Sequence, residues 1–265
     1  MKTKPRILVV YLLWTPNTVG SFLDSYHHHP AGIPHDLLIL DKGGHTIAPE
    51  GYEIMKISDH GRDIYAYSKL IPLSNKYDYI VFFGSSSIIK ADDWLLKLYS
   101  AICLDKAGIV GATGGPGTSR SMNDKSWWRK IIYPPYPNYH IRTSGFMLGT
   151  KTMRKVWPHY FNHLHPVLNY MSEHGRNNIT NRVEALGLKA LVVDKHGKTY
   201  EKQHWVNSNT FRIGGQINLL FGDKQTAIYE NASASERAIL CEKTWGISNN
   251  HLSDAAISNS QTSGI

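Results

Sequence analysis

The sequence predicts a single α/β domain with a mostly parallel β-sheet flanked by helices. Over the first 115 residues, apolar runs of strand length alternate with stretches of helical periodicity, as in βαβ units. The runs are apolar at consecutive positions, which is typical of strands buried on both faces. The chain has 265 residues, of which 42% are hydrophobic, so it is large enough to bury a substantial core.

The predicted strands are segments rich in Val, Ile, Leu, Phe and Tyr, and the second of them is ended by Gly43 and Gly44. The first is "RILVVYLL", and the fourth is "YDYIVFF". In chain order, the predicted strands span residues 6–13, 35–43, 51–58, 77–83, 107–115, about 141–148, and 189–194. Because several are separated by helix-length segments, their connections favour parallel pairing.

Helices are predicted where apolar residues recur every three or four positions. They span residues 19–26, 63–73, 92–104, 151–161, 177–187 and 232–243. Asp92 is expected to cap the third helix, and Gly187 to end the fifth. From Ser248 the chain is rich in Ser, Asn, Gln and Ala without periodicity, so residues 248–265 are expected to be a disordered tail.

Composition limits the classes of partner. The net charge is +8, which favours anionic partners, but Lys and Arg are scattered and no nucleic-acid-binding motif is present, so nucleic acid is not expected. No apolar run approaches the roughly 18 residues of a membrane span. The two cysteines, Cys103 and Cys241, fit no metal or disulfide pattern. We therefore expect a cytoplasmic protein.

The carboxyl ends of the predicted strands are the expected location of a ligand site. These ends are Trp14–Thr15, Asp41–Lys42, Gly84–Ser85 and Gly114–Gly115. Farther along, His140 and Arg142 alternate with Ile141, so an extended strand would point both polar side chains the same way, toward a ligand or toward solvent. The segment 210–230 is distinctive but has no assigned role, and Arg212 and Gln216 are its candidates for testing.

Four segments, in order, resemble the GT-A class of nucleotide-sugar glycosyltransferases. They are "YDYIVFFGSSSIIKADDWLLKLYSAI", "GIVGATGG", "HIRTSGFMLGTKTMRKVW" and "SEHGRNNITNRVEALGLKALVV". The resemblance covers about residues 5–195 and is strongest to bacterial polysaccharide-related transferases with an "HIRT" loop. It implies a GT-A-like, Rossmann-like domain over residues 1–247, with a nucleotide-donor half to about 118 and an acceptor half from 119.

The resemblance implies transfer of a sugar from a nucleotide-sugar donor to a hydroxyl of a bacterial surface glycan, free or lipid-linked. Where the family has an Asp-X-Asp motif, this chain has Ser85, Ser86 and Ser87. Hydroxyl groups alone bind Mg²⁺ or Mn²⁺ poorly. We therefore favour metal-independent transfer without a cofactor, although another acid remains an alternative source of metal ligands.

Without a metal, positive side chains or N–H donors must balance the charge of the leaving nucleoside diphosphate. The candidates are Lys42, Arg62, His140 and Arg142. Thr15 and the three serines are expected at the donor. Asp63 is expected to bind the nucleotide, or to cap the helix that follows it. Asp92 and Asp93 are interpreted as helix-capping residues.

Glu173 is the candidate general base of an inverting transfer, because its segment resembles the one that often carries this base in the family. The alternative is a surface glutamate at a helix N-terminus. Two other functions remain open: a non-catalytic nucleotide- or glycan-binding module, and a different nucleotide-dependent α/β enzyme. A basic surface would also favour peripheral contact with the inner face of an anionic membrane.

Overall fold

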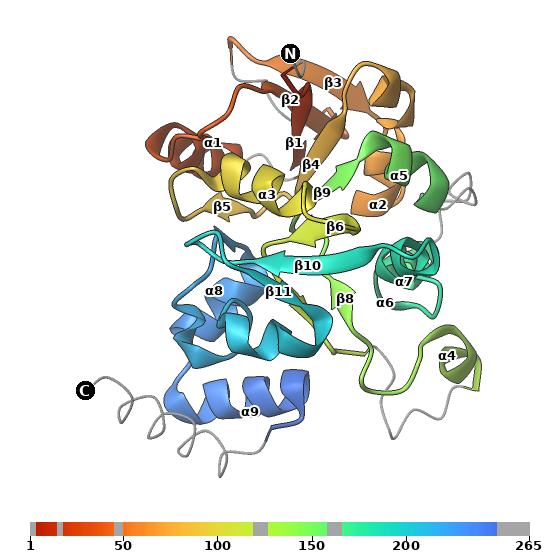
Figure 1. The fold of residues 1–265 in the computed structure, drawn as a ribbon, viewed down its shortest axis with the longest axis vertical. Coiled ribbons are helices and arrows are strands. Elements are labelled where there is room, and N and C mark those ends of the chain that lie inside the picture. The colour runs from red at the N-terminus through yellow and green to blue at the C-terminus, as the bar shows by residue number, and fades with distance from the viewer. Residues whose placement is uncertain (1–3, 15–17, 45–49, 119–126, 158–165, 248–265) are drawn as a thin grey trace.

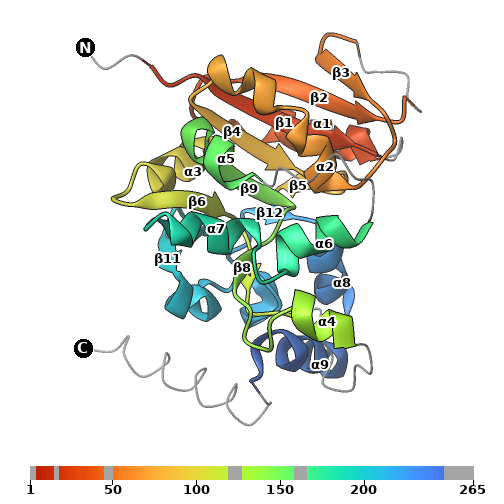
Figure 2. The ribbon, with the colours of Figure 1, turned by 90° about the vertical axis from the view of Figure 1, so that its right-hand side faces the viewer.

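The computed structural model describes residues 4–14, 18–44, 50–118, 127–157 and 166–247. An eight-stranded sheet with the order β11-β10-β6-β9-β4-β1-β2-β3 forms its centre (Figures 1 and 2). Its strands, in chain order, are β1 (Ile7–Leu13), β2 (Asp36–Lys42), β3 (Glu53–Ile57), β4 (Tyr79–Phe83), β6 (Ala107–Gly111), β9 (Gly145–Gly149), β10 (Lys189–Val193) and β11 (Thr199–Glu201).

The predicted mostly parallel sheet is confirmed, with two antiparallel strands. β1 pairs in parallel with β2 and β4, β2 with β3, and β6 with β10. β9 lies antiparallel between β4 and β6, and β11 is antiparallel to β10. The strand predicted at about 141–148 is divided: β8 (His140–Ile141) pairs with β7 (Gly114–Gly115) outside the main sheet, and β9 enters it.

Two hydrophobic clusters cover the two faces of the sheet, as the consecutive apolar runs predict. On one face, α1 (Val19–His28) and α3 (Trp94–Ile102) pack against residues such as Phe83. On the other, α2 (Asp63–Ser68), α5 (Thr150–Val156) and α7 (Ile179–Ala185) pack against residues such as Phe82. Both phenylalanines are fully buried, and Figures 1 and 2 show the helices on the two sides.

The remaining helices lie in the second half of the chain. They are α4 (Trp127–Ile132), α6 (Pro166–His174), α8 (Lys224–Asn231) and α9 (Ala234–Trp245). Of these, α4, α6 and α8 were not predicted from the sequence. Capping boxes at Asp223 and Ser233 begin α8 and α9, so the helix predicted at 232–243 is α9 with shifted ends. Gly187, with φ +75°, follows the end of α7 as expected.

The capping prediction is wrong for Asp92, and for Asp93 it is correct in position only. Asp93 is the N-cap residue of α3, but its side chain makes no capping hydrogen bond, and its φ is 54°. Asp92 instead pairs with His29, whose Nδ1 is 2.7 Å from Oδ1 of Asp92. This contact ties the end of α1 to the start of α3, so the carboxylate serves a tertiary contact rather than a helix terminus.

A short pair of strands brings the segment 210–230 to the ends of the central strands. β12 (Phe221–Gly222) pairs with β5 (Ile88–Ile89), which follows the three serines after β4. Residues 223–225 therefore lie beside Ser85 and Ser86.

Other predictions are tested in part. No helix among the described ranges has the length and hydropathy of a membrane span. Cys103 and Cys241 are both free. Thr15 and the expected tail 248–265 lie outside the described residues, and the domain limits stay a prediction.

Candidate functional site

Two cavities adjoin each other, and the first of them lies at the edge of the sheet where β1 and β4 end. The first, here called the strand-end cavity, has a volume of about 310 Å³ and is lined by residues from both halves of the chain. The second, here called the basic cavity, has a volume of about 460 Å³ and lies among residues of the second half and the loop after β7. Their shared lining residues are Arg142, Thr143, Glu173 and Gln225.

Most of the predicted site residues meet at these cavities. Those that line the strand-end cavity are Arg62, Asp63, Ser85, Ser86, Arg142 and Glu173. His140 lines the basic cavity beside Arg142, so the alternation at 140–142 does point both side chains to one place. His140 is 4% exposed, which rules out the alternative of a solvated polar strand face. The functional roles of these residues stay predictions.

Thr143 connects the two carboxylates of the site. Its hydroxyl donates a hydrogen bond of 2.9 Å to Oδ2 of Asp63, and its backbone N–H points to Oε1 of Glu173 at 3.4 Å. Asp63 is the first residue of α2 rather than its cap, since Arg62 occupies the N-cap position. The sequence analysis missed Thr143, although it follows directly after the His140–Arg142 segment.

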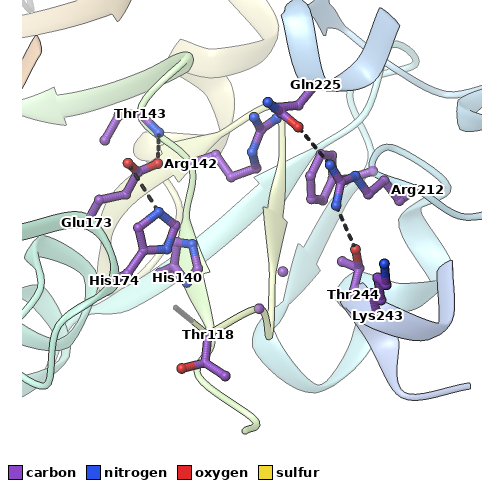
Figure 3. A pocket seen from close by; sticks show the side chains of 13 residues that line it. Thr118, His140, Arg142, Thr143, Glu173, His174, Arg212, Gln225, Lys243 and Thr244 are labelled. Carbon is purple, nitrogen blue, oxygen red and sulfur yellow. Dashed lines mark hydrogen bonds and ion pairs between the residues drawn. The ribbon is translucent and has the colours of Figure 1, made fainter. Parts of the chain in front are cut away.

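Glu173 lies in the last turn of α6 and is not a surface residue, because its side chain is only 15% exposed. Burial alone would raise the pKa of this carboxyl, but nearby His174 and Arg142 outweigh burial and hold the pKa below its ordinary value. Oε2 of Glu173 is 3.3 Å from Nε2 of His174 (Figure 3). The carboxylate is therefore ionised and can accept a proton.

His140 contributes no positive charge to the site. Burial, and next the nearby His174, lower its pKa to about 3. Nδ1 of His140 lies 2.8 Å from the carbonyl oxygen of Asn138, so this nitrogen carries the proton of the neutral ring. Nε2 is then left as an acceptor. His140 can orient a ligand or hold a metal, but it cannot balance a diphosphate.

The residues that best fit a metal ion are not the three serines. Ser87 is buried and donates its hydroxyl to the carbonyl oxygen of Ser144, 2.5 Å away. Among the described residues, one group has metal-ligand chemistry: His140, Glu173 and His174, whose ligand atoms lie within 4.8 Å of one another. Two imidazoles and a carboxylate suit Zn²⁺ or a similar ion. His140 and Glu173 were predicted as site residues but not as metal ligands, and His174 was not among the predicted site residues.

Lys42 lines neither cavity. Its side chain is fully buried, and Nζ is 2.6 Å from Oδ1 of Asp59 and 4.2 Å from the centre of the Trp14 ring. Its charge is therefore matched within the fold, although Trp14 itself lines the strand-end cavity. The neighbouring Asp41 is also buried, and its carboxylate oxygens have no hydrogen-bond partner among the described residues. A buried carboxyl group without a hydrogen-bond partner costs free energy, and a ligand could supply that partner. The end of β2 is therefore a candidate ligand contact.

Arg142 is held by the buried Asp223. Nη1 of Arg142 is 2.8 Å from Oδ2 of Asp223, and the two side chains are 13% and 6% exposed. Asp223 also accepts the backbone N–H groups of Gln225 and Thr226 at the start of α8. Burial alone would raise the pKa of Asp223, but Arg142 and hydrogen bonds from Ser144 and Thr226 lower it. Asp223 was not among the predicted site residues, because the helix that it begins, α8, was not predicted either.

Comparisons with known proteins give structural likenesses but no sequence match. No family model matches the sequence, and no curated protein matches it. Among solved structures, the chain is similar to the mannosyltransferase PcManGT from Pyrobaculum calidifontis, solved in complex with GDP-Man and Mn²⁺. The TM-score is 0.47 and the sequence identity 10%, over 72% of this chain and 55% of that one. The chain thus spans about half the length of this mannosyltransferase.

Proposed function

We propose that the chain is an inverting glycosyltransferase that transfers a sugar from a nucleotide-sugar donor to a hydroxyl of an acceptor glycan. The observation that carries this proposal is the position of Glu173 on the wall shared by two cavities. A transfer between two substrates needs two binding spaces and a proton acceptor between them. The strand-end cavity is the space for the donor, since ligands of such sheets bind where parallel strands end.

The proposed reaction is a single displacement. The acceptor hydroxyl oxygen attacks the anomeric carbon of the donor sugar while Glu173 takes the hydroxyl proton. The bond between the anomeric carbon and the phosphate oxygen breaks, and its electron pair stays on the departing nucleoside diphosphate. Attack on the side opposite the leaving group inverts the anomeric carbon.

Two arginines would stabilise the departing diphosphate. Arg142 and Arg62 both line the strand-end cavity, and the guanidinium of Arg62 lies over the Tyr170 ring at 4.8 Å from its centre. Charged N–H donors bind phosphate oxygens strongly. Asp63 lines the same cavity and offers carboxylate oxygens to a base or ribose hydroxyl. We propose that these charges take over the role of a metal at Ser85–Ser87.

A non-catalytic nucleotide- or glycan-binding module is the second candidate. It is favoured by the serines at 85–87 and by the low pKa of Glu173, since a weakly basic carboxylate is a poorer proton acceptor. The same cavities would then bind ligands without turnover. Donor consumption separates the two candidates, because only the enzyme releases a nucleoside diphosphate.

The first experiment is a thermal-shift screen against nucleoside diphosphates and nucleotide sugars, each with EDTA and with Mn²⁺. We expect one nucleotide family to raise the unfolding midpoint equally in both conditions, because ligands that bind the folded state stabilise it. Stabilisation only with Mn²⁺ would contradict metal-independent binding and would point to His140, Glu173 and His174. No shift with any nucleotide would contradict the proposed donor site.

A bacterial surface glycan, free or lipid-linked, is the proposed acceptor, and the basic surface would bring the protein to an anionic membrane. The net charge of +8 supports this contact. We expect the protein to sediment with vesicles that contain anionic phosphatidylglycerol at low salt and to dissociate near physiological ionic strength or above. Neutral phosphatidylcholine vesicles are the control. Equal binding to both vesicles, or binding that salt does not change, would contradict an electrostatic contact.

A further inference from the structure

The basic cavity contains more positive charge than its surroundings balance. Its charged lining residues are Arg142, Arg212, Lys243 and Glu173, so among the described lining residues Glu173 is the one acid. Arg142 is already paired with Asp223, and Glu173 with His174. Arg212 and Lys243 therefore remain as cations for which the described residues provide no ion pair.

Both the environment of the Arg212 side chain and its backbone conformation are energetically unfavourable. The guanidinium groups of Arg142 and Arg212 lie 4.2 and 5.1 Å from the centre of the same Phe211 ring. Burial and the nearby Arg142 lower the pKa of Arg212, and Asp223, which is itself paired with Arg142, offsets this lowering only in part. Its backbone has a φ of 51°, an unusual conformation for a residue with a side chain.

The hydrogen-bond partners of Arg212 are neutral. Nη2 donates to Oε1 of Gln225 at 2.7 Å, and Nη1 donates to Oγ1 of Thr244 at 3.3 Å (Figure 3). Nε is buried and has no hydrogen-bond partner among the described residues. These contacts fix the orientation of the guanidinium without matching its charge. An anionic ligand in the cavity would supply the missing charge.

We infer that the basic cavity binds the acceptor through a negatively charged oxyanion, a phosphate or a carboxylate, held by Arg212 and Lys243. The inference rests on the proposed function, which places the acceptor on this side of Glu173. The cavity volume of about 460 Å³ lies within the range of small-molecule sites, roughly 300–1,000 Å³. An acceptor anchored at Arg212 would present a hydroxyl toward Glu173, which lines the same cavity. The substrate class would be an acidic sugar or a sugar phosphate rather than a neutral glycan.

The test measures the binding of three probes by calorimetry: inorganic phosphate, inorganic pyrophosphate and glucuronate. The variants are Arg212→Gln and Lys243→Met, with Lys155→Met as an exposed lysine control outside both cavities. We expect both cavity variants to bind at least one probe about tenfold more weakly, and the control to bind it normally. Preference for glucuronate or for the phosphates identifies the source of the oxyanion.

Lys243 is exposed, so its variant stays informative even if Arg212→Gln fails to fold. Unchanged binding of every probe by Lys243→Met and by a folded Arg212→Gln would overturn the oxyanion site. If the two cavity variants lose nucleoside diphosphate binding as strongly as they lose binding of the oxyanion probes, the acceptor assignment is overturned, because the cavity would then hold the donor diphosphate. If oxyanion binding depends on Arg212 but no nucleotide binds the wild-type protein, the oxyanion site stands and the proposed glycosyltransferase function fails.

Discussion

Replacing Glu173 with glutamine is expected to lower kcat by about 10²–10⁴-fold, the usual contribution of a general base. Glutamine has nearly the same shape and keeps an oxygen that can accept the Thr143 N–H, which points to Oε1 of Glu173 at 3.4 Å. It cannot take a proton from a hydroxyl. Steady-state release of nucleoside diphosphate measures the effect, and unchanged stabilisation by the donor would show that the nucleotide site remains intact.

Glu242→Gln is the matched control, because Glu242 is an exposed acid on α9 that lines neither cavity. The pH dependence of kcat gives a second criterion for the role of Glu173 as the base. Since the pKa of Glu173 lies below its ordinary value, the carboxylate is ionised throughout the range from about pH 5 to 8, and no acid limb from this residue is expected there. Full activity in Glu173→Gln would exclude it as the base and favour the binding module.

The sequence predicts the central sheet well because its strands have a strong physical signal. Ile80, Val81, Phe82 and Phe83 are all fully buried, and four such residues in succession, bounded by turn residues, are typical of a strand covered on both faces. This uniformly apolar composition does not indicate whether a strand is parallel or antiparallel to its neighbours. β9, with the buried run Phe146–Leu148, is equally apolar but antiparallel, and nothing in its composition distinguishes it from its parallel neighbours.

The half of the site at the strand ends could be predicted for a similar reason. Parallel strands end at the same edge, so Trp14 after β1 and Ser85 after β4 were expected to converge, and both line the strand-end cavity. Arg212 and Asp223 could not be located from sequence. They reach the site through the pairing of Phe221 with Ile89, and such a two-residue ladder between distant segments leaves no periodic signal.

Replacing Arg142 with methionine is expected to destabilise the fold by about 3–5 kcal/mol, because removal of one partner of a buried ion pair leaves the other charge uncompensated. The remaining partner, Asp223, is 6% exposed. The double variant Arg142→Met/Asp223→Asn should recover much of this stability, since asparagine retains an oxygen for the N–H groups of Gln225 and Thr226. Urea unfolding measures the free energy of unfolding of each variant.

The pH dependence of this effect follows from the pKa of Asp223. In the wild-type protein the pKa is lowered, so its contribution to stability is present above the unfolded value of about 3.9 and is lost as the pH falls through the folded value. Without Arg142, burial of Asp223 favours its protonated form, so the pKa of Asp223 is lowered less than in the wild-type protein. The difference in stability between the wild-type protein and Arg142→Met should therefore be largest near pH 7 and smaller near pH 4.

The double variant Arg142→Met/Asp223→Asn should recover stability but not catalytic activity. Arg142 lines both cavities and is the cation shared by the proposed donor and acceptor sites, so the double variant should fold but turn over slowly. Loss of a positioned charge that stabilises a leaving group costs about 10²–10³-fold in kcat. A double variant that recovers both stability and turnover would show that Arg142 serves only to neutralise Asp223, and the diphosphate would then depend on Arg62.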